Sequence, residues 1–129
     1  HGGESILIPP NIGEHKMSAS HLFDEEVILH GLRPHMHYRG KYMRMSAIYP
    51  GGVRVDIINV PNYSFAWQPT YRLVEPILLP EGTRVLIEGA FDNSHHNLGN
   101  PDPNAIVRGG AQSWDEMFIG YFSYRRTGK

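Results

Sequence analysis

The chain has 129 residues, a formal net charge of -1 at pH 7 and no cysteine. This length fits one domain with its own core. The near-neutral charge, with no basic block, removes the usual electrostatic basis for binding nucleic acid or an anionic membrane surface. The absence of cysteine excludes disulfides, thiolate catalysis and Cys-ligated zinc, and no apolar run approaches the ~20 residues of a membrane-spanning helix.

The first part of the chain, residues 1–24, is predicted to be an N-terminal extension or linker. A short strand is expected at 5–8, where Pro9 and Pro10 would end it. No period links the histidines further along this segment. His1 is an alternative copper ligand through its amine and imidazole, and this would need a free α-amine created by processing.

Residues 25–32 are apolar enough to predict a strand that leads into His35 and His37. On an extended backbone, residues two apart leave the same face, so these two imidazoles are expected to share one metal ion. The plainer alternative is two histidines on one exposed strand face. His30 lies an odd number of positions from the pair and is interpreted as structural, unless the nearby glycine and proline break the register.

The middle of the chain predicts a β-hairpin, with strands at 42–49 and 53–60 joined by a Pro-Gly-Gly turn. Residues 63–67 alternate aromatic and small side chains, which indicates a half-buried strand. The methionines and aromatic residues of these segments are interpreted as core or core-edge residues rather than ligands: Met43, Met45, Tyr63, Phe65 and Trp67.

Two more strands follow at 71–79 and 83–91. Pro76 within the first favours an edge position or a bulge. The segment 92–104 is dense in turn-forming residues and predicts a long loop. Its His95–His96 pair indicates a secondary metal or substrate site, and the alternative is a surface loop whose Asn and Asp side chains cap their own turns.

The last strand is predicted at 114–124, with Met117, Ile119 and Tyr121 on one face. Residues 125–129 form a polar tail. The pattern gives about eight strands and no helix, which predicts an all-β domain over residues 25–124, an antiparallel β-sandwich or jelly roll. Eight histidines and five methionines supply imidazole and thioether groups, the ligand types that suit copper.

The pairing of an early His-Met-His-Tyr-Arg-Gly-Lys, from His35 to Lys41, with a late Trp-Asp-Glu-Met-Phe-Ile-Gly-Tyr, from Trp114 to Tyr121, resembles a known family. It is similar to the C-terminal domain of the copper type II ascorbate-dependent monooxygenases, which include peptidylglycine α-hydroxylating monooxygenase and dopamine β-monooxygenase. The resemblance runs from about Val27 to Tyr124. It also extends to bacterial domains of this type, stand-alone or attached to redox modules.

This resemblance implies that His35, His37 and Met117 bind the one copper ion at which oxygen reacts. It further implies that Arg33 and Tyr121 contact the carboxylate of a small organic or peptide substrate. The alternative for Arg33 is an ion pair with an Asp or Glu across the sheet. The family's peptide-amidating branch has an asparagine two residues after the methionine, where this chain has Ile119. That departure weakens the case for a peptidylglycine substrate.

The family's full enzyme has a second copper domain, which these 129 residues do not contain. One copper ion stores one electron and monooxygenation needs two. If the domain is an enzyme, it is therefore a copper-dependent monooxygenase that takes electrons from a haem domain or a second copper domain. The resemblance implies a periplasmic or extracellular location. The alternative is a non-catalytic β-sandwich for assembly or recognition that retains the ligands.

Overall fold

The computed structural model describes residues 6–66, 70–110 and 112–128, and in these ranges the protein is all-β, with nine strands and no helix. His1 and Trp67 lie outside the described residues. The strands are β1 (Leu7–Ile8), β2 (His15–Leu22), β3 (Val27–His35), β4 (Gly40–Ile48), β5 (Arg54–Val60), β6 (Tyr71–Leu79), β7 (Arg84–Phe91), β8 (Val107–Arg108) and β9 (Ile119–Arg126).

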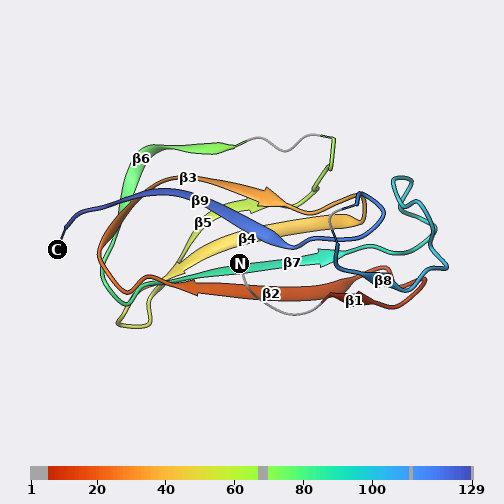
Figure 1. Cartoon of the computed structure of the whole chain (residues 1–129). Helices are drawn as coiled ribbons and strands as arrows, with labels where there is room; N and C mark the ends of the chain where they lie inside the picture. The colour runs from red at the N-terminus through yellow and green to blue at the C-terminus, as the bar shows by residue number, and fades with distance from the viewer. Residues whose placement is uncertain (1–5, 67–69, 111, 129) are drawn as a thin grey trace.

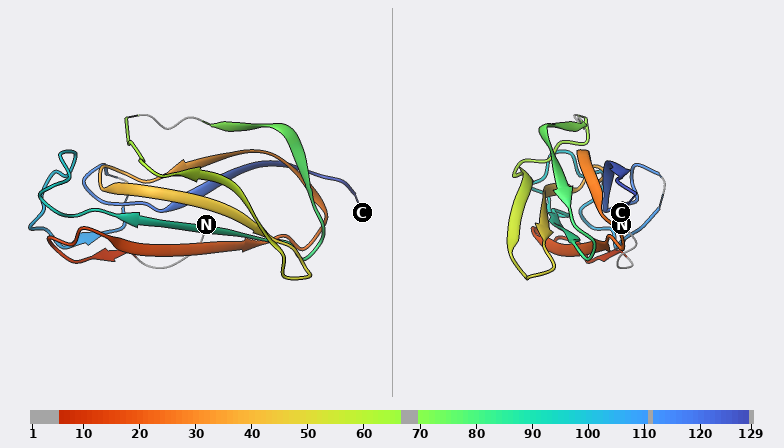
Figure 2. Two further views of the ribbon diagram at one scale, coloured as in Figure 1. Left: turned by 180° about the vertical axis from the view of Figure 1, so that it is seen from behind. Right: turned by 90° about the vertical axis from the view of Figure 1, so that its left-hand side faces the viewer.

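Two antiparallel sheets form the body of the molecule, one with strand order β2-β7-β4-β5 and the other with order β6-β3-β9. Figures 1 and 2 show the three-stranded sheet lying over the four-stranded one. A Cβ added to Gly120 of β9 would stand 2.8 Å from Met45 and 2.7 Å from Ile87, so the two sheets pack face to face. The predicted antiparallel β-sandwich is therefore confirmed. The strand orders do not establish the jelly-roll alternative.

Alternating apolar residues explain why the core lies between the sheets. In β4, Met43, Met45 and Ala47 are buried, and β7 contributes Val85 and Ile87 in the same way. Alternate side chains of a strand leave opposite faces, so each of these strands gives one apolar face to the core. The predicted hairpin of β4 and β5 is confirmed by their antiparallel pairing.

The strand β3 contains a bulge between Leu29 and Gly31, where its register with both neighbours shifts. A Cβ at position 31 would lie 2.9 Å from the carbonyl oxygen of Tyr71, so glycine allows the close approach of β6. The bulge reverses the alternation, because Val27 and Leu29 are buried before it and Leu32 after it. His30 is therefore partly exposed, like positions 33 and 35, and lies on the same side of β3 as they do. In a regular strand without the bulge, His30 would lie on the opposite face.

Pro76 lies within β6, which is an edge strand of its sheet, so the position predicted for this proline is confirmed. Three other expectations were wrong in detail. Residues 15–22 had no recognised period, but they form β2 and pair with β7 along their whole length. The described part of 63–67 is not a strand. The last strand begins at Ile119 rather than Trp114.

The turn between β3 and β4 and the loop 92–104 lie at the same end of the sandwich, and the C-terminus lies at the other end (Figure 1). The β4–β7 register explains this proximity, since Gly40 at the start of β4 pairs with Phe91 at the end of β7. The predicted loop is thus held against the segment that carries the His-x-His motif. Among the described residues, no helix has the length and apolar character needed to cross a membrane.

Candidate metal centre

The two histidines of the His-x-His motif lie at the end of β3. Their ring centroids are 5.1 Å apart, with an angle of 85° between the ring planes. His35 is half-buried and His37 is only 4 % exposed. The expectation that the motif brings two imidazoles together is confirmed.

The ring of His37 is oriented by a backbone group. Its Nδ1 lies 3.0 Å from the carbonyl oxygen of Asp115. A carbonyl oxygen can only accept a hydrogen bond, so Nδ1 must carry the proton. The neutral ring therefore keeps the lone pair on Nε2, which is the arrangement of metal-binding histidines whose other nitrogen donates to a carbonyl or carboxylate.

The aromatic ring of Phe65 packs against the His37 ring and against Tyr38. The centroid of Phe65 lies 5.5 Å from that of His37 and 4.7 Å from that of Tyr38. Phe65 was predicted to be a core-edge residue of a strand. It lies instead in a turn segment and packs against the candidate metal ligand, a role that the sequence pattern did not indicate.

A buried carboxylate lies under the motif. Glu116 has no exposed surface, and its Oε1 accepts the amide N–H of His37 at 2.9 Å. Its Oε2 accepts the amide N–H of Arg39, also at 2.9 Å. One side chain therefore joins the backbone of the His-x-His segment to that of the segment that follows Trp114.

Burial raises the pKa of Glu116 to about 7, because the ionised carboxylate loses its hydration. The amide donors and the positive charge of Arg39 act in the opposite direction. The Nη1 of Arg39 lies 4.0 Å from Oε2 of Glu116, and both side chains are almost completely buried. This is a buried ion pair with hydrogen bonds on both partners, the condition under which such a pair is tolerated in a core.

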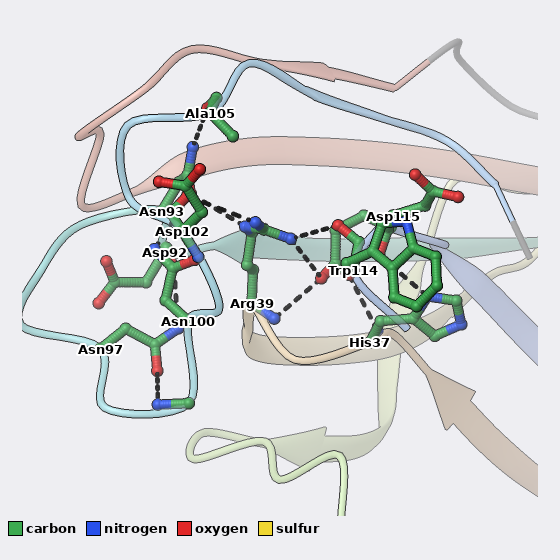
Figure 3. A network of polar contacts seen from close by, with 12 residues as sticks. His37, Arg39, Asp92, Asn93, Asn97, Asn100, Asp102, Ala105, Trp114 and Asp115 are labelled. Atoms are coloured by element: carbon green, nitrogen blue, oxygen red, sulfur yellow. Dashed lines mark hydrogen bonds and ion pairs between the residues drawn. The ribbon is translucent and has the colours of Figure 1, made fainter. Parts of the chain in front are cut away.

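Arg39 connects three loops (Figure 3). Its Nη1 donates to the carbonyl oxygen of Trp114 at 2.7 Å and its Nε donates to Oδ1 of Asn93 at 2.9 Å. Its Nη2 is 3.5 Å from the carbonyl oxygen of Asp102. The guanidinium thereby ties the β3–β4 turn to the 92–104 loop and to the segment that precedes β9.

Within the 92–104 loop, Asn93 is fully buried and donates to the carbonyl oxygens of Pro9 and Ala105. Asx-type contacts then shape the rest of the loop, as when Asp92 accepts the N–H of Ser94. The loop's Asn and Asp residues therefore cap their own turns, as the surface-loop alternative predicted. His95 and His96 are both exposed, with ring centroids 4.1 Å apart, and their binding of a metal or substrate stays a prediction.

Tyr63 clamps the residue between the two histidines. Its hydroxyl accepts the amide N–H of Met36 at 3.0 Å and donates to the Met36 carbonyl oxygen at 2.7 Å. Met36 itself is fully buried in the core.

The β3–β9 register aligns the other predicted site residues. Arg33 pairs with Tyr121, and His35 pairs with Ile119. The guanidinium carbon of Arg33 lies 4.4 Å from the Tyr121 ring centroid, and this ring lies 6.1 Å from that of His35. Arg33 was considered as a substrate ligand or as the partner of a carboxylate across the sheet. Its cross-strand partner is an aromatic ring.

Met117 is half-buried and directly follows Glu116, which contacts the backbone of His37. Its segment and the His-x-His turn are therefore neighbours in space, although 80 positions apart in sequence. Ile119 and Tyr121 lie opposite His35 and Arg33, and Met117 precedes the first residue of β9 by two positions. Its role as the sulfur ligand stays a prediction.

Among residues 6–66, 70–110 and 112–128, no three His, Asp or Glu side chains come together to form a metal-binding group. A site of two imidazoles and one thioether is a different kind of group. No protein-family model and no curated protein sequence matches this chain. The resemblance to the copper monooxygenases therefore rests on the sequence motifs alone.

No sequence motif identified Glu116, Arg39 or Asn93 as site residues, although they form the buried network behind the histidines. The sequence contains one indication of Glu116. This residue lies an even number of positions before Phe118, Gly120 and Phe122, which face the core. A carboxylate at such a position is costly unless it is hydrogen-bonded, so it indicates a built polar contact.

Proposed function

We propose that this protein is a copper-binding redox domain in which His35, His37 and Met117 hold one copper ion. The observation that carries the proposal is the hydrogen bond between Nδ1 of His37 and the carbonyl oxygen of Asp115, beside a second imidazole. It leaves Nε2 of His37 as the metal-binding nitrogen and joins the two segments that carry the proposed ligands.

The spacing of the two rings fits one shared ion. With metal–nitrogen bonds of about 2.0 Å and tetrahedral angles, two imidazole centroids stand about 5 Å apart. The rings of His35 and His37 are separated by 5.1 Å. Two imidazoles with a thioether suit copper, since thioether sulfur favours Cu(I) and the carboxylate or third histidine typical of a zinc hydrolase is not part of the set.

Copper bound here would supply one-electron chemistry with dioxygen. The protein's own contribution is to orient the His37 ring through Asp115 and to cover it with Phe65. Arg33 and Tyr121 lie beside His35 and offer a cation and a half-exposed ring at the mouth of the site. We propose that this pair contacts a small organic or peptide substrate and that the domain works in the periplasm or outside the cell.

Turnover of a monooxygenase needs a second electron, so the domain would act within a larger redox chain whose haem or second copper centre is the donor. Oxygen uptake by the copper-loaded domain with a reductant, compared with free copper, tests this step. No uptake above free copper would favour the alternative of an assembly module that retains its ligands. Two large apolar side chains, Leu98 in the 92–104 loop and Trp114 next to Arg39, are exposed and would suit such a module.

Copper titration followed by electron paramagnetic resonance tests the ligand set. The parent should bind one Cu(II) ion per chain, and His35→Ala and His37→Ala should each abolish or change that signal. Met117→Leu keeps the volume of the side chain and removes the sulfur, so it should weaken Cu(I) binding more than Cu(II) binding. His21→Ala removes an exposed histidine of β2 and is the matched control. If all three ligand variants bind copper as the parent does, the assignment is wrong.

A further inference from the structure

The two segments that carry the proposed ligands meet on a single side chain. The Glu116 carboxylate accepts the amide N–H groups of His37 and Arg39, and Met117 is the next residue after Glu116. Glu116 and its two donors are far apart in sequence. The position of one ligand-bearing segment relative to the other therefore depends on this carboxylate.

The carboxylate is buried and has a charged neighbour. Glu116 has no exposed surface, and the Arg39 guanidinium lies 4.0 Å from Oε2. Arg39 in turn donates hydrogen bonds to the Trp114 carbonyl oxygen and to Asn93. A different orientation of the Glu116 side chain would break the contacts with both amides and with Arg39.

A carboxylate is the side chain that suits two backbone N–H donors and a neighbouring guanidinium. It offers only acceptor sites, about four lone pairs on two oxygens. A glutamine at this position would keep one oxygen and present an NH₂ group to a backbone N–H, so at least one amide would face a donor. An aspartate would keep the charge and be one methylene shorter, so it would not reach both amides of the His-x-His segment without a shift of the backbone.

We infer that Glu116 is a positioning residue that sets the separation of the His37 and Met117 backbones before a metal binds. The importance of this spacing for metal binding rests on the proposed copper function, because a preformed spacing matters only if the two segments carry ligands. The role of Glu116 in holding the two segments together is a property of the metal-free protein and can be measured without copper.

The first measurement is amide hydrogen exchange of the metal-free protein by NMR. In Glu116→Gln, exchange of the amides of residues 37 and 39 should accelerate by about tenfold or more, while the amides of β7 keep the parent's rates. Glu75→Gln is the matched control, since it makes the same change at an exposed position of β6. Glu116→Asp provides a charged second variant if the glutamine variant fails to fold. Parent-like exchange at both amides would overturn the inference.

The second measurement is copper binding by the variants. Loss of a group that orients a metal ligand typically costs about 10- to 100-fold in metal affinity, and Glu116→Gln should lose this much while Glu75→Gln stays near the parent. Its Cu(II) spectrum should also shift, which a general loss of stability would not produce in the folded fraction. If His35→Ala and His37→Ala lose copper while Glu116→Gln binds it as the parent does, the inference fails and the proposed function stands. If the parent binds no copper at these residues, the proposed function fails, and the exchange rates still decide whether Glu116 holds the two segments together.

Discussion

Arg33 and Tyr121 face each other across the β3–β9 pair, with the guanidinium carbon of Arg33 4.4 Å from the ring centroid of Tyr121. Arginine over an aromatic face is attracted by the ring quadrupole. Both side chains lie beside His35, so the stacked pair forms the surroundings of this proposed ligand.

A double-mutant cycle of Arg33→Gln and Tyr121→Leu should give a coupling free energy of about 0.5–1 kcal/mol in urea unfolding of the metal-free protein. Arg125→Gln combined with Tyr121→Leu is the control. Arg125 lies four residues further along β9, so the free energies of unfolding of the two single variants should add. A coupling for Arg33 no larger than that for Arg125 would show that the stacked contact contributes nothing.

A second prediction concerns Gly40, at the start of β4. An added Cβ would stand 2.6 Å from the Tyr63 ring and 2.9 Å from the Cβ of Met36. Gly40→Ala must therefore displace the tyrosine that holds the Met36 backbone. We expect a loss of about 1–3 kcal/mol in the free energy of unfolding, as for overpacking in a core.

The matched control is Gly51→Ala in the β4–β5 turn, where an added Cβ would meet no atom within 4 Å. This variant should unfold within about 0.5 kcal/mol of the parent. Chemical denaturation of both variants checks the prediction. Equal stabilities of the alanine variants at positions 40 and 51 would contradict the close packing of Tyr63.

The sequence predicted the strands whose apolar residues alternate over several positions, such as β4 and β7, because burial on one face leaves that pattern. It missed β2, where Met17 and Ala19 are the buried residues and polar side chains surround them. That strand is specified by its long pairing with β7 more than by its own composition.

At the candidate site, too, the local sequence pattern predicted some features and missed others. The i, i+2 spacing of His35 and His37 is local information, and the structure brings their rings together as the spacing predicted. The partners of Glu116 and Phe65 lie on segments brought together by the fold, so no local pattern predicts them, although the parity of Glu116 indicates a polar contact. The bulge at His30 is a further example, because it lies where the Tyr71 carbonyl of the neighbouring strand comes close to Gly31.

The third prediction concerns the pH dependence of a surface ion-pair network. Glu88 of β7 accepts hydrogen bonds from Arg44 and Arg54. Partial burial raises the pKa of the Glu88 carboxyl, but the hydrogen bonds and charges of the two arginines outweigh it and leave this pKa below its usual value. A lowered pKa stabilises the fold at pH values above the unfolded pKa, and this contribution is lost as the pH falls through the folded pKa.

Glu88→Gln should therefore lower the free energy of unfolding at pH 7 by about 1 kcal/mol or less, since the network is partly exposed, and should have no effect near pH 3. Urea unfolding at both pH values checks this. Glu75→Gln on the exposed edge strand β6 is the control and should have the same small effect at each pH. A Glu88→Gln effect that does not change between the two pH values would contradict the assignment of the lowered pKa to Glu88.

The last prediction concerns Asn93, whose amide uses its full hydrogen-bonding capacity. Its Oδ1 accepts from Arg39 and Asn100, and its Nδ2 donates to the carbonyl oxygens of Pro9 and Ala105. Asn93→Ala leaves several buried groups without a partner, each at a cost of about 1–3 kcal/mol. Asn93→Asp keeps the shape and replaces both donors by an acceptor that faces two carbonyl oxygens.

We therefore expect Asn93→Asp to be at least as destabilising as Asn93→Ala near pH 7, although aspartate is the closer isostere. The added carboxylate gains the attraction of the Arg39 guanidinium, but two carbonyl dipoles and the loss of hydration oppose it. Thermal and urea unfolding of both variants measure the order, with Asn59→Ala on the exposed side of β5 as the control. If the aspartate variant is clearly the more stable of the two, attraction by Arg39 outweighs the two lost donors, and the buried network is held mainly by charge rather than by the direction of its hydrogen bonds.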